Sequence, residues 1–200
     1  MKRTFKLICV IVAAVMLFAG CAVEDVPTTE PSRQNPQLDT QYSGPLSLGD
    51  KMPELTVTTV HGETLLLSEL LQSKKMVVLN FWFADCIWCI REFPVMEASY
   101  QQYREDVEIL ALNPYDASDH IAAFQQEHSL SFPMASCSRD LATAFGVSGY
   151  PTSVIIDREG TICLIHPGAI TEKQVFDRLF ETFTSDDYSS VLYNSISELF

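Results

Sequence analysis

The sequence predicts an α/β protein, a single three-layer α/β/α sandwich around a mixed sheet. Stretches typical of strands alternate with stretches whose apolar residues recur every three or four positions, as in helices. Residues 76–83 are apolar on both faces, as expected of a central strand covered by helices on each side. A chain of 200 residues with 47% apolar content has room for one such domain and tails, but not for a second full domain. The alternation also implies a right-handed parallel crossover.

The first twenty residues predict a secretory signal. Basic residues at positions 2, 3 and 6 precede an apolar run over residues 7–18, which is too short to span a bilayer comfortably. Residues 17–21, Leu-Phe-Ala-Gly-Cys, resemble the lipobox of bacterial lipoproteins, in which the chain is cut before the cysteine and the sulfur receives a diacylglycerol. We therefore expect residues 1–20 to be a signal peptide and Cys21 to be lipidated. An ordinary secretory signal with an incidental cysteine, or an uncleaved anchor, is the alternative.

Residues 21–45 are rich in Pro, Thr, Glu, Gln and Ser and have almost nothing to bury. They predict a disordered tether between the membrane and a folded domain over residues 46–183. Loss of residues 1–20 changes the formal net charge from −13 to −16. A chain with this negative charge is not expected to bind nucleic acid or anionic lipid surfaces. Attachment to the membrane would therefore come from the acyl chains on Cys21.

The domain is expected to begin with a β-hairpin. Residues 55–60 and 64–67 flank His61-Gly62, and Gly62 accepts the positive φ that such a turn needs. A short helical turn over residues 68–71 follows. The later strands are expected at residues 76–83, 107–112, 132–135, 152–156 and 161–165, the last two as a hairpin.

Helices are expected between these strands. One carries Ile90 to Tyr103 on its buried face, and the next runs from a cap at Ser118 or Asp119 to His128. This second helix and residues 132–135 form an inserted helix-plus-strand segment. The remaining helices are expected at residues 139–145 before Gly146, at 171–183 from a Thr171–Gln174 capping box, and at 184–200. The last of these is amphipathic, and we expect it to pack on the domain rather than to bind a partner.

Cysteine usage points to redox chemistry at residues 86–89. With Cys9 in the signal and Cys21 lipidated, the cysteines that remain are Cys86, Cys89, Cys137 and Cys163. Two thiols three residues apart at a helix start lie on one face, and they can form and break a disulfide without backbone movement. A loop this short adds little stability through chain entropy, so chemistry explains the pair better. Nothing in the sequence supports a second disulfide between Cys137 and Cys163.

Five short motifs occur in order between residues 80 and 160. They are Asn80-Phe81-Trp82, Cys86-Ile87-Trp88-Cys89, Arg91-Glu92-Phe93-Pro94, Gly149-Tyr150-Pro151-Thr152 and Ile156-Asp157-Arg158-Glu159-Gly160. Over residues 46–183 the chain resembles the TlpA/ResA group of membrane-tethered, extracytoplasmic thiol-disulfide oxidoreductases. The resemblance implies a thioredoxin fold with an N-terminal β-hairpin and a central insertion. The chain departs from the group at Asp85, where Trp is usual, and at Trp88, where Pro is frequent.

Three residues are expected to do the chemistry. Cys86 lies at a helix N-terminus, which favours the thiolate, so it is the predicted nucleophile, and the more buried Cys89 resolves the mixed disulfide. Glu92, three residues after Cys89 on the same helix face, is the candidate base. A solvated acid of the first helical turn is the alternative for Glu92. Asn80 occupies the place of the buried acid of thioredoxin and cannot titrate, so proton transfer falls to Glu92 or Asp85.

Other residues are expected to tune the thiols and bind the client. Asp85 disfavours a second negative charge on Cys86, so we expect a moderately reducing protein. The bond between Tyr150 and Pro151 is expected to be cis, with Pro151 facing the disulfide and Tyr150 pairing with an extended client segment. A trans turn proline is the alternative. Trp88 is assigned to an apolar substrate-binding rim; Trp82 is assigned to the same rim and to tuning, or else to the core.

The sequence therefore predicts a monomeric enzyme without cofactor or metal. The resemblance implies that it passes electrons from a membrane donor of the CcdA type to extracytoplasmic protein disulfides. A Cu(I)-binding chaperone is one alternative, although such proteins use a wider cysteine spacing and a later histidine, for which only the remote His166 is available. A peroxiredoxin needs Thr or Ser three residues before its cysteine, where this chain has Phe83. A binding lipoprotein with a relic disulfide is the last alternative.

Overall fold

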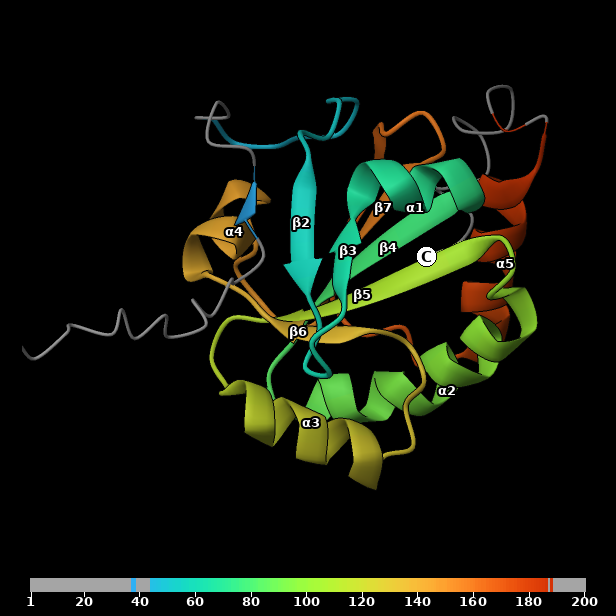
Figure 1. Ribbon diagram of the computed structural model, residues 1–200. Coiled ribbons are helices and arrows are strands. Elements are labelled where there is room, and N and C mark those ends of the chain that lie inside the picture. The colour runs from blue at the N-terminus through green and yellow to red at the C-terminus, as the bar shows by residue number, and fades with distance from the viewer. Residues whose placement is uncertain (1–36, 39–43, 187, 189–200) are drawn as a thin grey trace, which may run out of the picture. The chain divides into compact units, whose positions relative to one another are not determined.

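A computed structural model of the chain describes residues 37–38, 44–186 and 188 (Figure 1). The predicted signal peptide, Cys21 and most of the predicted tether lie outside the described residues. So does most of the predicted helix over residues 184–200. Among the described helices, none is both long enough and apolar enough to cross a membrane.

A five-stranded mixed sheet forms the centre of the domain, in the strand order β6-β5-β4-β7-β8. Its strands are β4 (Met76–Phe81), β5 (Val107–Asn113), β6 (Met134–Ser136), β7 (Thr152–Asp157) and β8 (Ile162–Pro167). Strand β4 pairs in parallel with β5 and antiparallel with β7, and all of its side chains are buried. The predicted mixed sheet with a central apolar strand is confirmed.

Helices cover both faces of this sheet, as predicted (Figure 1). They are α1 (Leu67–Ser73), α2 (Ile87–Tyr103), α3 (Ser118–Glu127), α4 (Arg139–Ala144) and α5 (Lys173–Thr184). Alternate residues of β4 belong to two separate apolar clusters. Met76 and Val78 pack with residues of α2, α3 and α5, whereas Val77, Leu79 and Phe81 pack with residues of α1 and α4. The period-two geometry of a strand thus divides one apolar run between two cores.

The predicted hairpin consists of β2 (Leu55–Thr58) and β3 (Thr64–Leu66), and Gly62 has a φ of 85°. A third strand, β1 (Gln37–Leu38), pairs antiparallel with β2. Residues 37–38 lie inside the stretch predicted as tether, so regular structure begins before residue 46. Composition did not reveal this strand because backbone pairing at a sheet edge needs no apolar side chain.

The helix caps differ from those predicted. The N-cap of α3 is Ala117, while Ser118 Oγ lies 3.2 Å from Ser136 Oγ. The N-cap of α5 is Glu172, and no side chain caps this helix, so the predicted capping box at Thr171 does not form. A side-chain cap is present at α4 instead, where Ser138 Oγ accepts a hydrogen bond from Leu141 N at 3.1 Å.

Beyond α5, Tyr188 packs on the domain. Its ring centroid lies 5.2 Å from that of Phe183, and its side chain contacts the core cluster formed with α2 and α5. Arg158 also forms an ion pair with Asp186 at 3.2 Å. The beginning of the C-terminal segment therefore contacts the domain, as expected from its amphipathic pattern.

Candidate active site

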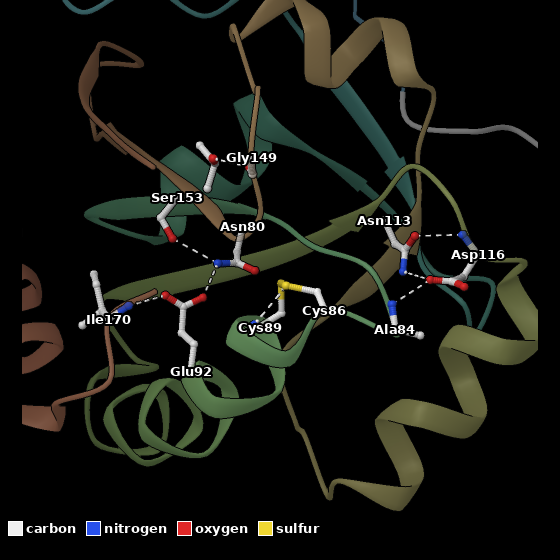
Figure 2. The surroundings of a disulfide bond; sticks show 11 residues. Asn80, Ala84, Cys86, Cys89, Glu92, Asn113, Asp116, Gly149, Ser153 and Ile170 are labelled. Atoms are coloured by element: carbon white, nitrogen blue, oxygen red, sulfur yellow. Dashed lines mark hydrogen bonds between the residues drawn. A yellow bond between two sulfur atoms is a disulfide. The ribbon is translucent and has the colours of Figure 1, made fainter. Parts of the chain in front are cut away.

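The dithiol lies where β4 leads into α2 (Figure 2). Cys86 is the N-cap of α2 and forms a disulfide with Cys89, with the two Cα atoms 5.2 Å apart. Cys86 is 5% exposed and Cys89 is fully buried, which agrees with the predicted order of accessibility. The backbone N–H of Cys89 donates a hydrogen bond to Cys86 Sγ at 3.1 Å. A donor aimed at this sulfur stabilises negative charge on it, so the geometry favours Cys86 as the thiolate.

Glu92 lies one helical turn after Cys89 and is completely buried. Its carboxylate accepts hydrogen bonds from Asn80 Nδ2 and from the backbone N–H of Ile170, each at 2.9 Å (Figure 2). Burial raises the pKa of Glu92 to about 7, against the opposing effect of these two hydrogen bonds. The alternative of a solvated acid is therefore wrong. A carboxyl group that titrates near neutral pH suits proton transfer.

The partners of Glu92 come from distant parts of the chain. Asn80 on β4 is paired in register with Ser153 on β7, and Asn80 Nδ2 also donates to Ser153 Oγ at 3.0 Å. Ile170 precedes α5. Neither Ser153 nor Ile170 was identified from the sequence, because strand register and loop course decide these contacts.

A second polar group holds the loop before Cys86. Asp116, just after β5, accepts hydrogen bonds from Ala84 N and Asn113 Nδ2, both at 2.8 Å, and lies 3.3 Å from His120 Nδ1. Burial alone would raise the pKa of Asp116, but the hydrogen bonds from Ala84 and Asn113, together with His120, outweigh it and lower the pKa. Sequence reasoning missed Asp116. It ties the end of β5 to the residue two positions before the nucleophile.

The peptide bond between Tyr150 and Pro151 is cis, as expected. The Tyr150 ring packs edge-on against Phe83 and Tyr115, with centroids 5.4 and 5.5 Å away. Phe83, at the position where a peroxiredoxin has Thr or Ser, therefore belongs to an aromatic cluster with Tyr115 and Tyr150.

The two tryptophans have different surroundings. Trp88 is 52% exposed, with the Arg91 guanidinium 4.8 Å from its ring centroid. Trp82 is fully buried and packs against Phe93 and Phe124, so its assignment to the rim is wrong and the core alternative is right. Trp82 follows directly after β4, and its ring is enclosed in the core cluster that includes residues of α2 and α3.

The other two cysteines among the described residues, Cys137 and Cys163, are buried and have free thiols, so no second disulfide forms between them. Burial raises the pKa of each of these two thiols to about 12. Within the described part of the chain, no three His, Cys, Asp or Glu side chains are grouped as a metal site requires.

A thioredoxin-type sheet with a dithiol at the start of α2 defines the class of thiol-disulfide oxidoreductases. The AhpC/TSA family matches residues 48–165. Thioredoxin-like protein YneN of Bacillus subtilis is 32% identical over 135 residues, which are 66% of this chain and 78% of that protein. Thiol-disulfide oxidoreductase ResA of Halalkalibacterium halodurans is 34% identical over 129 residues, or 64% and 72% of the two chains.

Solved structures agree with these relatives. A putative thiol:disulfide interchange protein DsbE from Chlorobium tepidum has a TM-score of 0.62 at 26% identity, over 70% of this chain and 99% of that one. The chain therefore belongs to the AhpC/TSA family and, within it, to the ResA-like thiol-disulfide oxidoreductases. The predicted fold and enzyme class are confirmed.

Proposed function

We propose that the protein is a reductase of protein disulfides in which Cys86 is the nucleophile, Cys89 the resolving thiol and Glu92 the base. The main support is the buried Glu92 carboxyl group one turn after Cys89, with its pKa near 7. A proton acceptor is needed at this place because Cys89 has to lose its proton before it attacks.

The proposed reaction has two exchange steps. The Cys86 thiolate attacks a client disulfide and forms a mixed disulfide, and the first client sulfur leaves as a thiolate that takes up a proton from solvent. Cys89 then gives its proton to Glu92 and attacks Cys86 Sγ. The Cys86–Cys89 disulfide forms, and the second client sulfur leaves. The client gains two electrons, which a separate donor restores to the enzyme.

Two features near Cys86 support this direction of electron flow. Asp85, which is exposed, is its neighbour in sequence, and Cys86 itself has little solvent around it. Both features oppose the effect of the Cys89 N–H donor: they disfavour the thiolate of Cys86 and so favour the disulfide form, and a protein that prefers its disulfide form is a reductant.

Redox titration against glutathione tests this direction. We expect a potential well below about −120 mV, the value typical of a strong oxidant whose reduced form is stabilised. A measured potential close to that value would show that the protein donates disulfides and would overturn the proposed direction.

The proposed client surface surrounds the disulfide. Trp88 and Ile87 expose 52% and 56% of their surface beside the dithiol, and few other large apolar side chains of the described domain are as exposed. An extended client segment would pair with the backbone at Tyr150, next to the cis Pro151, and place apolar side chains on this surface. Unfolded or partly unfolded disulfide proteins fit this description.

We also propose that the enzyme acts as a monomer outside the cytoplasm, anchored by a lipid on Cys21, and receives electrons from a membrane donor of the CcdA type. The signal and lipobox pattern of residues 1–21 supports the anchor, and the resemblance of the sequence motifs to the TlpA/ResA group implies the donor class. Cys21→Ser is expected to move the protein from the membrane fraction to the soluble fraction of the cells. Equal membrane retention of both forms would contradict lipidation at Cys21.

A further inference from the structure

The side-chain oxygen of Asn80 is a buried acceptor without a hydrogen-bond donor among the described residues. Asn80 is fully buried, and its Nδ2 atom serves both Glu92 Oε2 and Ser153 Oγ. An unsatisfied buried polar atom destabilises the folded state, so its presence at an active site calls for an explanation.

The network fixes which way the amide faces. Turning the carboxamide over would set its oxygen against the Glu92 carboxylate, acceptor against acceptor, and would leave Nδ2 facing away from both of its partners. With Nδ2 directed to Glu92 and Ser153, Oδ1 points to the side on which the Cys86–Cys89 disulfide lies (Figure 2). A disulfide has no proton to donate, whereas a reduced cysteine has one.

We propose that, in the reduced protein and in the mixed disulfide, Asn80 Oδ1 accepts a hydrogen bond from the Cys89 thiol and so positions Cys89 for the resolving step. The inference rests on the proposed assignment of Cys89 as the resolving cysteine. Asn80 gains and loses no proton. The proton of Cys89 passes to Glu92, which the same amide holds in place through Nδ2.

This arrangement distinguishes the two sulfurs. The backbone N–H of Cys89 faces Cys86 Sγ and favours its thiolate, whereas an acceptor oxygen facing Cys89 favours its protonated form. The thiolate is thereby confined to Cys86 until a mixed disulfide exists. Asn80 therefore helps to ensure that Cys86 attacks the client first and Cys89 attacks second, although Asn80 itself cannot titrate.

Infrared spectroscopy of the reduced protein tests the hydrogen bond. The Cys89 S–H stretching band, isolated by subtracting the spectrum of Cys89→Ser, is expected at lower wavenumber in the native protein than in Asn80→Leu. Ser153→Ala, which removes one partner of Nδ2 and leaves Oδ1 in place, should keep the native band. In single-turnover kinetics, Asn80→Leu should slow client release from the mixed disulfide about tenfold and leave its formation unchanged, because the variant no longer positions Cys89 and Glu92, and the loss of one positioning hydrogen bond changes a rate by this order.

An unshifted Cys89 band in Asn80→Leu, with native insulin reduction intact, would overturn the role of Asn80 and leave the proposed function standing. Failure of the native protein to reduce insulin would instead reject the proposed function. Should Asn80→Leu not fold, the band of the native protein is compared with that of an alkanethiol in an apolar solvent, where the S–H group has no acceptor. Coincidence of these two bands would equally exclude the hydrogen bond.

Discussion

Cys86→Ser is expected to reduce insulin at the uncatalysed rate, whereas Cys89→Ser is expected to accumulate a mixed disulfide with its client. The two cysteines differ in accessibility, 5% against 0%, and in the N–H donor that only Cys86 Sγ receives. Without Cys86 no accessible thiolate remains to start the exchange. Without Cys89 the first exchange proceeds, but nothing removes the client from Cys86.

Capture on membrane extracts under non-reducing conditions, followed by mass spectrometry, measures the second outcome and identifies the client. Cys137→Ser and Cys163→Ser are matched controls, because burial raises the pKa of both thiols to about 12 and neither is paired. Both controls should retain full activity. A mixed disulfide formed by Cys86→Ser through Cys89 would reverse the assignment of nucleophile and resolving thiol.

The elements that were predictable are those whose cause lies within a short stretch of sequence. The apolar run of β4 (Met76–Phe81) predicts a buried strand, and the spacing of Cys86 and Cys89 at a helix start predicts a redox-active dithiol. The hairpin around Gly62 follows from the backbone freedom of a single residue. Each of these features depends on residues that are neighbours in the sequence, and each is present in the folded domain.

The features that escaped prediction depend on the packing of distant segments. Ser153 meets Asn80 only because β7 pairs with β4 in one register, and Asp116 reaches Ala84 only because β5 ends beside the active-site loop. The caps of α3 and α5 were misplaced because a hydroxyl or carboxyl group near a helix start has several competing partners. Glu92 is buried because the segments that carry Ile170 and Asn80 pack against it, and its raised pKa follows from this burial. Neither contact can be seen from the residues next to Glu92 in the sequence.

Glu92→Gln is expected to remove a loss of about 3 kcal/mol in the free energy of unfolding that the native protein undergoes as the pH rises from 4 to 8. The pKa of Glu92 is about 7 in the folded protein and 4.5 for the ordinary side chain. Below pH 4.5 the carboxyl group is protonated in both states and has no effect. Between pH 4.5 and 7 the unfolded chain ionises first, so the folded state loses stability as pH rises, and above pH 7 the cost is constant at about 3 kcal/mol.

Glutamine is neutral throughout, so the stability of Glu92→Gln relative to the native protein should rise by about this amount between pH 4 and pH 8. Urea unfolding of the oxidised protein at the two pH values measures the change. The difference between the two proteins cancels every other titrating group. Glu105→Gln, at an exposed site, should show no such change, and an equal change in both variants would contradict a special environment for Glu92.

The same substitution tests the catalytic role of Glu92. In the native protein the rate of client release from the mixed disulfide should rise with pH through about 7, because only the ionised carboxylate accepts the proton of Cys89. Glu92→Gln should lose this rise and release the client about 100-fold more slowly, a typical loss for removal of a general base. Single-turnover measurements across pH 5 to 9 compare the two proteins. A native-like pH profile in Glu92→Gln would mean that the proton of Cys89 leaves by another route, even if the stability difference appears as expected.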